Sequence, residues 1–113
     1  MNDKFFRMIG LSMRAGKIEV GEAKTEDRLR CGKSRLVIIS EDASENTVKK
    51  FSSLCKNHKV PFVVAGNREI LGNYTGRDFA VVLTVSDEGF AKRLTELADD
   101  TKIIESGRYY EKG

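Results

Sequence analysis

The chain has 113 residues, which fit one domain with a hydrophobic core of its own. Hydrophobic residues make up 40% and charged residues 33%, which argues against a disordered chain, and the longest apolar runs are too short to cross a membrane. The net charge is only +3, too small to identify a nucleic-acid partner by itself.

The first part of the chain is predicted to form two helices and then a buried strand. Apolar residues at helical spacing predict a first helix that ends at Gly16, and residues 18–20 form a short extended link. A polar helix over residues 22–31, ended by Gly32, comes next. Residues 35–40 are a continuous run rich in β-branched residues, which is typical of a strand buried on both faces.

The middle of the chain alternates helix and strand. Asp42 or Ser44 is expected to cap the helix that follows the central strand, and residues 60–64 form the next strand. Asn67 is expected to cap a short helix that ends before residue 72. Residues 72–77 contain a glycine near each end and are predicted to form a glycine-bracketed loop.

A last strand and helix complete the pattern. Residues 79–84 predict another buried strand, and Ser86 or Asp87 then caps the last helix. The alternation predicts an α/β fold, a three-layer α/β/α sandwich around a small mixed sheet. We expect a single domain over residues 1–100, with residues 101–113 forming a tail or a weak strand.

Basic residues gather in the first third of the chain. Residues 1–36 contain nine Lys or Arg against five Asp or Glu, a balance of +4. This asymmetry favours a polyanionic partner, although modest charge imbalance is also common on solvated surfaces. The cations surround the polar helix and its two flanking turns: Arg14, Lys17, Lys24, Arg28, Arg30, Lys33 and Arg35.

The sequence contains no complete catalytic site. Glu41 and Asp42 follow the central strand, where open sheets place ligands, but helix capping explains them better than catalysis. A small nucleotide-dependent enzyme is therefore a distant alternative. Cys31 and Cys55 form no C-x-x-C pair and His58 lies in a polar stretch, so we expect two reduced, partly buried thiols and neither metal nor cofactor. These features predict a cytoplasmic protein that is not an enzyme.

Several strings, in order, resemble one family. Residues 35–47, Arg-Leu-Val-Ile-Ile-Ser-Glu-Asp-Ala-Ser-Glu-Asn-Thr, and residues 85–91, Val-Ser-Asp-Glu-Gly-Phe-Ala, closely resemble the bacterial YlxQ-type proteins, as do residues 14–17, Arg-Ala-Gly-Lys. These proteins belong to the superfamily of the archaeal kink-turn-binding ribosomal protein seven-Ae and the eukaryotic large-subunit protein thirty-e. The resemblance spans roughly residues 4 to 98.

The resemblance implies an α/β/α sandwich that binds structured RNA, typically a kink-turn with sheared G·A pairs, without catalysing a reaction. In this superfamily the second helix enters the widened groove through its amino end, and a glycine-bracketed loop covers the extruded nucleotide. Gly21 matches the glycine that opens the helix, and Ser44 falls near the position that touches the flipped base. The positions around the loop are matched by Arg68, Gly72, Gly76 and Arg77.

The start of the second helix departs from the archaeal pattern Gly-Ala-Asn-Glu-x-x-Lys. Ala23 replaces the Asn, Lys24 replaces the base-reading Glu, and Asp27 replaces the phosphate-facing Lys. A lysine can still donate to guanine, whereas Asp27 would repel phosphate unless an arginine pairs with it. Whether kink-turn specificity survives is left open by the sequence.

We expect Lys24 to approach the bases, and the phosphate contacts to come from Lys17, Arg28 and Lys33. The expected partners are structured RNA, including ribosomal RNA, and the ribosome or translation factors, for a monomeric chain that does not bind a membrane. The alternative is a protein-interaction module associated with the translation machinery, in which the fold survives and kink-turn specificity is lost.

Overall fold

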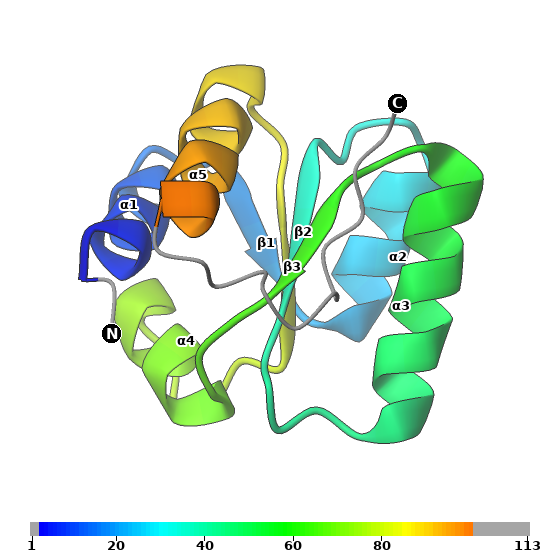
Figure 1. The fold of residues 1–113 in the computed structure, drawn as a ribbon, viewed down its shortest axis with the longest axis horizontal. Coiled ribbons are helices and arrows are strands. Elements are labelled where there is room, and N and C mark those ends of the chain that lie inside the picture. The colour runs from blue at the N-terminus through cyan, green and yellow to red at the C-terminus, as the bar shows by residue number, and fades with distance from the viewer. Residues whose placement is uncertain (1–2, 101–113) are drawn as a thin grey trace.

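Five helices and four short strands alternate along residues 3–100, the part of the chain that the computed structural model describes (Figure 1). In chain order they are α1 (Asp3–Arg14), β1 (Ile18–Val20), α2 (Glu22–Arg30), β2 (Leu36–Ile39), α3 (Glu45–His58), β3 (Phe62–Val64), α4 (Arg68–Thr75), β4 (Val82–Val85) and α5 (Glu88–Asp100). The tail or weak strand expected over residues 101–113 lies outside the described residues.

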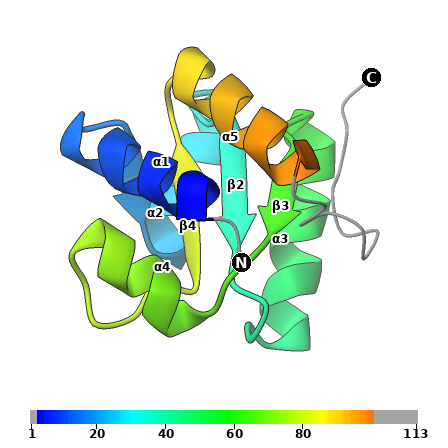
Figure 2. The ribbon, with the colours of Figure 1, turned by 60° about the vertical axis from the view of Figure 1, so that its left-hand side comes forward.

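The strands form one mixed sheet in the order β1-β4-β2-β3. Strands β2 and β3 run parallel, and β4 is antiparallel to both β1 and β2. The two edge strands, β1 and β3, have three residues each. Helices α1, α4 and α5 cover one face of the sheet, and α2 and α3 cover the other (Figures 1 and 2). The predicted three-layer sandwich with a small mixed sheet is confirmed.

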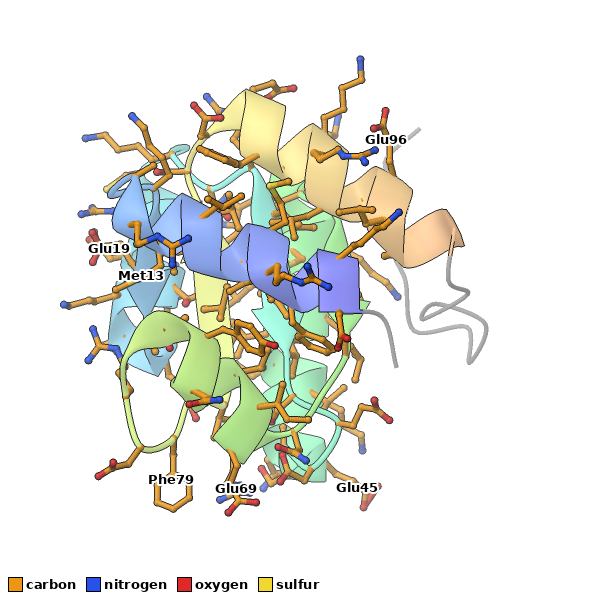
Figure 3. All side chains as sticks on the ribbon, turned by 90° about the vertical axis from the view of Figure 1, so that its left-hand side faces the viewer. Met13, Glu19, Glu45, Glu69, Phe79 and Glu96 are labelled. Atoms are coloured by element: carbon orange, nitrogen blue, oxygen red, sulfur yellow. The ribbon has the colours of Figure 1, made fainter. Side chains whose placement is uncertain are left out.

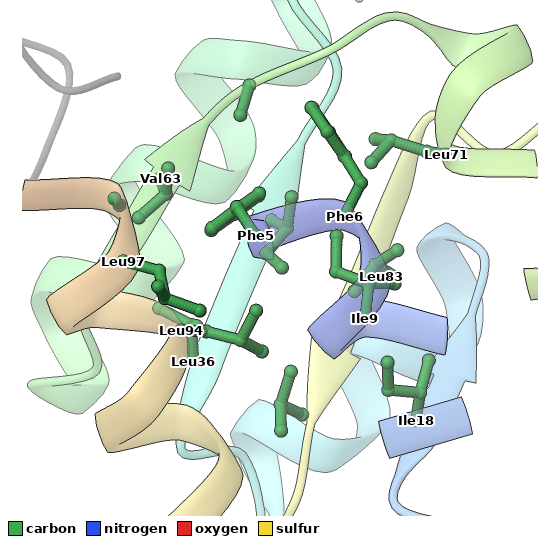
Figure 4. Packing of buried hydrophobic residues seen from close by; sticks show 14 of the residues in the cluster. Phe5, Phe6, Ile9, Ile18, Leu36, Val63, Leu71, Leu83, Leu94 and Leu97 are labelled. Atoms are coloured by element: carbon green, nitrogen blue, oxygen red, sulfur yellow. The ribbon is translucent and has the colours of Figure 1, made fainter. Parts of the chain in front are cut away.

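Two hydrophobic clusters hold the layers together. Every residue of β2 is fully buried, as predicted from its β-branched run, and successive side chains point to opposite faces. Leu36 and Ile38 pack with α1 and α5 (Figure 4), whereas Val37 and Ile39 pack toward α2 and α3. The central strand therefore contributes to both cores.

Side-chain caps set the start of three helices. Ser44 accepts a hydrogen bond from the backbone N–H of Thr47, and Asn67 accepts one from that of Ile70. At α5 the acceptor is Asp87, whose carboxylate binds the backbone N–H of Phe90 at 2.9 Å. Each cap satisfies a helix N–H that has no partner within the helix. Ser44 and Asp87 are thus the caps among the predicted alternatives.

The predicted loop over residues 72–77 is wrong. Residues 72–75 continue α4, and the helix ends at Gly76, whose φ of 74° is the left-handed conformation that glycine adopts easily. Glycine weakens a helix, which is why the sequence pattern predicts a loop at Gly72. Its role is steric, since a Cβ at Gly72 would lie 2.8 Å from the carbonyl oxygen of Arg77. The loop is therefore formed by residues 76–81.

The strand predicted from residue 79 begins instead at Val82. Phe79 is 60% exposed and precedes the sheet, so its apolar side chain does not belong to the core. The backbone N–H of Ala80 donates to the carbonyl of Arg68 at 2.9 Å, which holds this segment against α4. Pairing with β2 therefore begins only at Val82.

The two thiols differ, which corrects the expectation that both are partly buried. Cys31 is exposed, whereas Cys55 is fully buried on the inner face of α3, and this burial raises the pKa of the Cys55 thiol to about 12. Because the thiolate is the reactive form, we expect one thiol to react rapidly with a disulfide reagent at pH 8 and the second only after unfolding. Measuring the reacted thiols with and without denaturant checks this. Replacing Cys31 with Ser should remove the fast reaction, and two fast thiols would contradict the prediction.

Candidate nucleic-acid interface

Four chain segments meet at one end of the sheet. The backbone N–H of Gly21 donates to the carbonyl of Val82 at 2.9 Å, and that of Ser40 donates to the carbonyl of Val81 at 2.8 Å. In Figure 3, Glu45 at the start of α3, Glu69 in α4 and Phe79 all lie along the same lower edge of the molecule. We call this region the loop end; it comprises the first turn of α2, residues 41–44, the first turn of α4 and residues 76–81.

The backbone amides at the start of α2 are not capped by a side chain. Gly21 has φ 114° and ψ 157°, a conformation that side chains rarely adopt, and no side chain caps the helix. The amides of the first turn therefore keep free donor capacity, which suits an anion such as phosphate. The hydroxyl of Thr47 lies 3.4 Å from the Glu22 carboxylate and donates to it, so the starts of α2 and α3 lie side by side.

Asp42 fixes the loop that precedes α3 against the start of α4. Its carboxylate accepts from the backbone N–H of Arg68 at 3.1 Å and from Arg68 Nε at 3.2 Å, and its carbonyl accepts from Arg68 Nη2 at 2.9 Å. Desolvation raises the pKa of Asp42, but the neighbouring hydroxyl of Ser40 and the backbone amide and guanidinium of Arg68 outweigh it and lower the pKa overall. Because the buried Ser40 hydroxyl makes no hydrogen bond of good geometry, the Arg68 contacts carry this effect.

This arrangement assigns Asp42 and Arg68 a structural role. Asp42 caps the start of α4 and not that of α3, and the Arg68 guanidinium is already occupied by Asp42. Ser44, two residues after Asp42, is exposed at the surface of the loop end although its hydroxyl caps α3. The Asp42–Arg68 contacts therefore position Ser44 relative to α4.

The segment after α4 presents an arginine and an aromatic ring. Gly72 allows the backbone of residues 77 and 78 to lie directly against α4, and Gly76 turns the chain there. Arg77 and Phe79 are exposed and, with Glu69, Ile70, Asn73 and Asp78, line an open hollow of about 600 Å³. Sequence reasoning missed Phe79 by placing it in a strand. Its position three residues after the glycine that ends α4 is the signal that could have shown it as a loop residue.

The cations on α2 are paired with carboxylates in the free protein. Lys24 lies 3.7 Å and Arg28 3.9 Å from the two carboxylate oxygens of Glu19. Arg28 also donates to Asp27 at 2.9 Å, so the acid that departs from the archaeal pattern is neutralised by its neighbour. Such exposed pairs contribute about 0–1 kcal/mol, so exchanging a carboxylate for a phosphate costs little.

A second ion-pair group joins α2 to α3. Glu26 accepts from Arg30 at 2.6 Å and lies 3.0 Å from Lys50. Hydrogen bonds from Arg30 and Lys50 lower the pKa of Glu26, which stays ionised at neutral pH. Arg30 and Lys50 therefore neutralise an acid on the side of α2 that faces α3, away from Lys24 and Arg28.

Lys17 and Lys33 lie at the opposite end of the sheet. The carbonyl of Lys17 accepts from Ser86 after the end of β4, and the backbone N–H of Lys33 donates to Arg28 past the end of α2. The nine residues of α2 span about 13.5 Å, which separates Lys33 from Gly21. The structure brings together at the loop end Gly21, Lys24, Ser44, Arg68, Gly76 and Arg77. Gly72 lies against the backbone of residues 77 and 78 of this region, and Arg28 lies one helical turn beyond Lys24.

Residues 3–100 contain neither a metal-binding cluster nor a membrane-spanning helix. No three His, Cys, Asp or Glu side chains of this range lie close enough together to hold a metal ion. No helix in the same range has the length and apolar character needed to cross a membrane.

Residues 3–95 match the family described as ribosomal protein L7Ae/L30e/S12e/Gadd45. The chain belongs to this family. The resemblance predicted from the sequence strings is thereby confirmed, and the fold places the family's helix–sheet–helix layers as expected.

Relatives within the L7Ae/L30e/S12e/Gadd45 family cover most of the chain. The RNA-binding protein YlxQ of Bacillus subtilis is 38% identical over 96 residues, which is 85% of this chain and 96% of that protein. The corresponding protein of Enterococcus faecium is 35% identical over 85% of this chain and 92% of its own length. The large ribosomal subunit protein eL8 of Thermoplasma volcanium is 30% identical over 79% of this chain and 74% of its own.

Solved structures share this fold. A protein of Bacillus halodurans superposes with a TM-score of 0.83 at 36% identity, covering 85% of this chain and 97% of that one. The Giardia lamblia 15.5kD RNA binding protein superposes with a TM-score of 0.72, covering 90% and 91% of the two chains. Its identity is 18%, so it shows the shared fold alone.

Proposed function

We propose that the protein is a ribosomal-protein-like RNA-binding protein of the cytoplasm that recognises structured, kink-turn-like RNA at the loop end and catalyses no reaction. The observation that carries this proposal is the convergence of the uncapped start of α2 with the exposed Arg77 and Phe79 at one end of the sheet. Helix amides suit phosphate, and an exposed ring suits an unstacked base. The names of the YlxQ and eL8 relatives support RNA as the partner.

Each residue of the loop end has a role in this proposal. Lys24, on the first turn of α2 and 60% exposed, donates to base edges, and Arg28 exchanges Glu19 for a phosphate. Arg77 and Phe79 cover a base that leaves the stack. Arg68, Gly72 and Gly76 hold this surface in place, and Ser44 lies at its edge. Lys17 and Lys33 contact only an RNA that follows α2 to its far end.

The test is a titration of the protein with a kink-turn RNA and with a plain duplex of equal length, at two salt concentrations. We expect tighter binding of the kink-turn and an affinity for both RNAs that falls as salt rises, because phosphate contacts release counterions. Equal, salt-independent binding of the two RNAs would overturn the proposal.

Lys24 and Lys33 form a matched pair at the two ends of α2. Lys24→Ala should reduce the preference for the kink-turn by about 1–3 kcal/mol, or roughly five- to 150-fold, because a base contact is lost. Lys33→Ala should leave the preference for the kink-turn intact. It should reduce the salt slope by about 1 only when the RNA is long enough to reach Lys33. Fluorescence anisotropy with the same two RNAs measures both effects. Identical behaviour of the two variants would contradict these roles.

A second candidate is a protein-interaction module associated with the translation machinery. The pairing of the α2 cations with Glu19, Glu26 and Asp27 supports it, because a surface of balanced charge also suits a protein partner. Co-purification of translation components that resists ribonuclease would support this alternative. Complete loss after ribonuclease would favour RNA.

A further inference from the structure

The arginines of residues 3–100 fall into two groups. Five of the eight pair with a carboxylate: Arg28, Arg30, Arg35, Arg68 and Arg93. The other three, Arg7, Arg14 and Arg77, have no carboxylate within ion-pair distance in this part of the chain. An unpaired arginine binds an incoming anion without first breaking an ion pair.

The three unpaired arginines line two adjoining hollows. Arg77 belongs to the hollow at the loop end, whereas Arg7 and Arg14 line a second one, of about 370 Å³, between α1 and α4. Asn73 lines both hollows and joins them. Figure 3 looks onto this face, where α1 crosses above α4 and Phe79 lies at the lower edge. We call the second hollow the α1–α4 strip; it is lined by Arg7, Gly10, Leu11, Arg14, Asn73 and Tyr74.

Helix geometry explains the order of charges along the strip. Arg7, Leu11 and Arg14 follow one another at spacings of four and three residues, so they share one face of α1. The two arginines are about 10.5 Å apart along the helix axis. Leu11 is 46% exposed and lies between these two cations.

The floor of the strip is rigid. The Tyr74 ring stacks on the buried ring of Phe6 with a centroid separation of 5.9 Å. At Gly10, where a Cβ would lie 3.6 Å from the Tyr74 carbonyl, α1 passes close to α4. The strip is therefore built on two packed helices and not on a loop, so its two arginines start from a fixed backbone.

We propose that the α1–α4 strip binds the phosphate backbone of an RNA arm that leaves the loop end, with Arg7 and Arg14 as its phosphate contacts. This inference rests on the proposed function: the loop end would bind the kink-turn itself, and the strip would bind an arm of the same RNA. RNA is favoured because the strip continues at Asn73 into the surface with Arg77 and Phe79, and because two arginines flank its one exposed leucine. Arginine also suits the planar geometry of phosphate.

The test compares two variants with the same change in net charge. Arg7→Glu with Arg14→Glu alters the strip, whereas Lys56→Glu with Lys92→Glu alters exposed lysines of α3 and α5 that form no ion pair within the described part of the chain. The RNA probes are a minimal kink-turn and the same RNA with one arm, then the other, extended by about ten base pairs, one helical turn.

The unmodified protein should bind one extended RNA more tightly than the minimal one. Two phosphate contacts correspond to a salt slope of about −1.8, so this gain should fall about 12-fold between 50 and 200 mM salt. The strip variant should lose the gain and bind the minimal RNA as the control variant does. The control variant should keep the gain.

The proposal is overturned if no extended RNA binds more tightly than the minimal one, or if the gain persists in the strip variant. The second result would favour a protein as the partner of the strip. If the minimal kink-turn RNA shows no preference over duplex, the proposed function fails. The strip is then judged on duplex RNA alone. Loss of salt-dependent duplex binding in the strip variant supports it, and unchanged duplex binding overturns it. Thermal melts confirm that the variants are folded. If the Arg7→Glu, Arg14→Glu variant unfolds, Arg7→Gln with Arg14→Gln is used in its place.

Discussion

Replacing Gly72 by Ala should destabilise the domain by about 1–2 kcal/mol. The new Cβ would lie within 2.8–2.9 Å of backbone atoms of Arg77 and Asp78, which cannot rotate away. Overpacking of this kind costs about 1–3 kcal/mol, and the better helix propensity of alanine recovers about 0.5–1 kcal/mol of it. Thermal or urea unfolding measures the net loss. Because the clash displaces the segment that carries Arg77 and Phe79, RNA affinity should fall as well.

Gly10 provides the matched control for Gly72. It also lies inside a helix, but a Cβ there meets its nearest neighbours at 3.6–3.8 Å, which is ordinary van der Waals contact. Gly10→Ala should therefore be neutral or stabilise the domain by up to about 1 kcal/mol. If both substitutions changed the free energy of unfolding equally, the steric account of Gly72 would be wrong.

Replacing Phe79 by Ala should weaken binding of structured RNA by about 1–3 kcal/mol, or roughly five- to 150-fold, because a ring that stacks on a base is removed. The free energy of unfolding should change by less than about 0.5 kcal/mol, since the side chain is 60% exposed. Parallel binding and unfolding measurements separate these effects.

Two further substitutions show whether stacking or apolar area matters at residue 79. Phe79→Tyr keeps an aromatic face and should retain most of the affinity, whereas Phe79→Leu should behave like Phe79→Ala. An alanine variant that binds as tightly as the unmodified protein would remove Phe79 from the interface.

Local signals in the sequence predicted most of the fold. The β-branched run identified the central strand, and the capping side chains Ser44 and Asn67 marked the starts of α3 and α4. These features depend on residues within one turn or one strand, so the sequence alone is enough to show them.

Tertiary packing decided what the sequence could not. A glycine such as Gly72 usually indicates a loop. The close packing of the backbone of residues 77 and 78 against Gly72 explains why this position in the helix is a glycine. Phe79 has the signal of a strand, but β4 pairs with its neighbours from Val82 onward. Both errors concern contacts between α4 and the chain that follows it.

The candidate site was predictable in its residue types but not in its layout. Lys17 lies in the α1–β1 connection and Lys33 in the α2–β2 connection, and the structure places both at the end of the sheet opposite to Gly21, with Lys33 a full helix length away. The pairing of Lys24 and Arg28 with Glu19 also depends on the position of β1 beside α2. Charge counts along the chain cannot show which cations are already neutralised.

The short edge strands affect how copies of this protein meet one another. A sheet edge with unpaired N–H and C=O groups is a template on which another chain can add a strand, as in amyloid growth. At β1 and β3 only three residues each form that edge, and Pro61, which has no N–H, immediately precedes β3. Strand addition at either edge therefore gains few hydrogen bonds, which protects the domain against aggregation through its sheet.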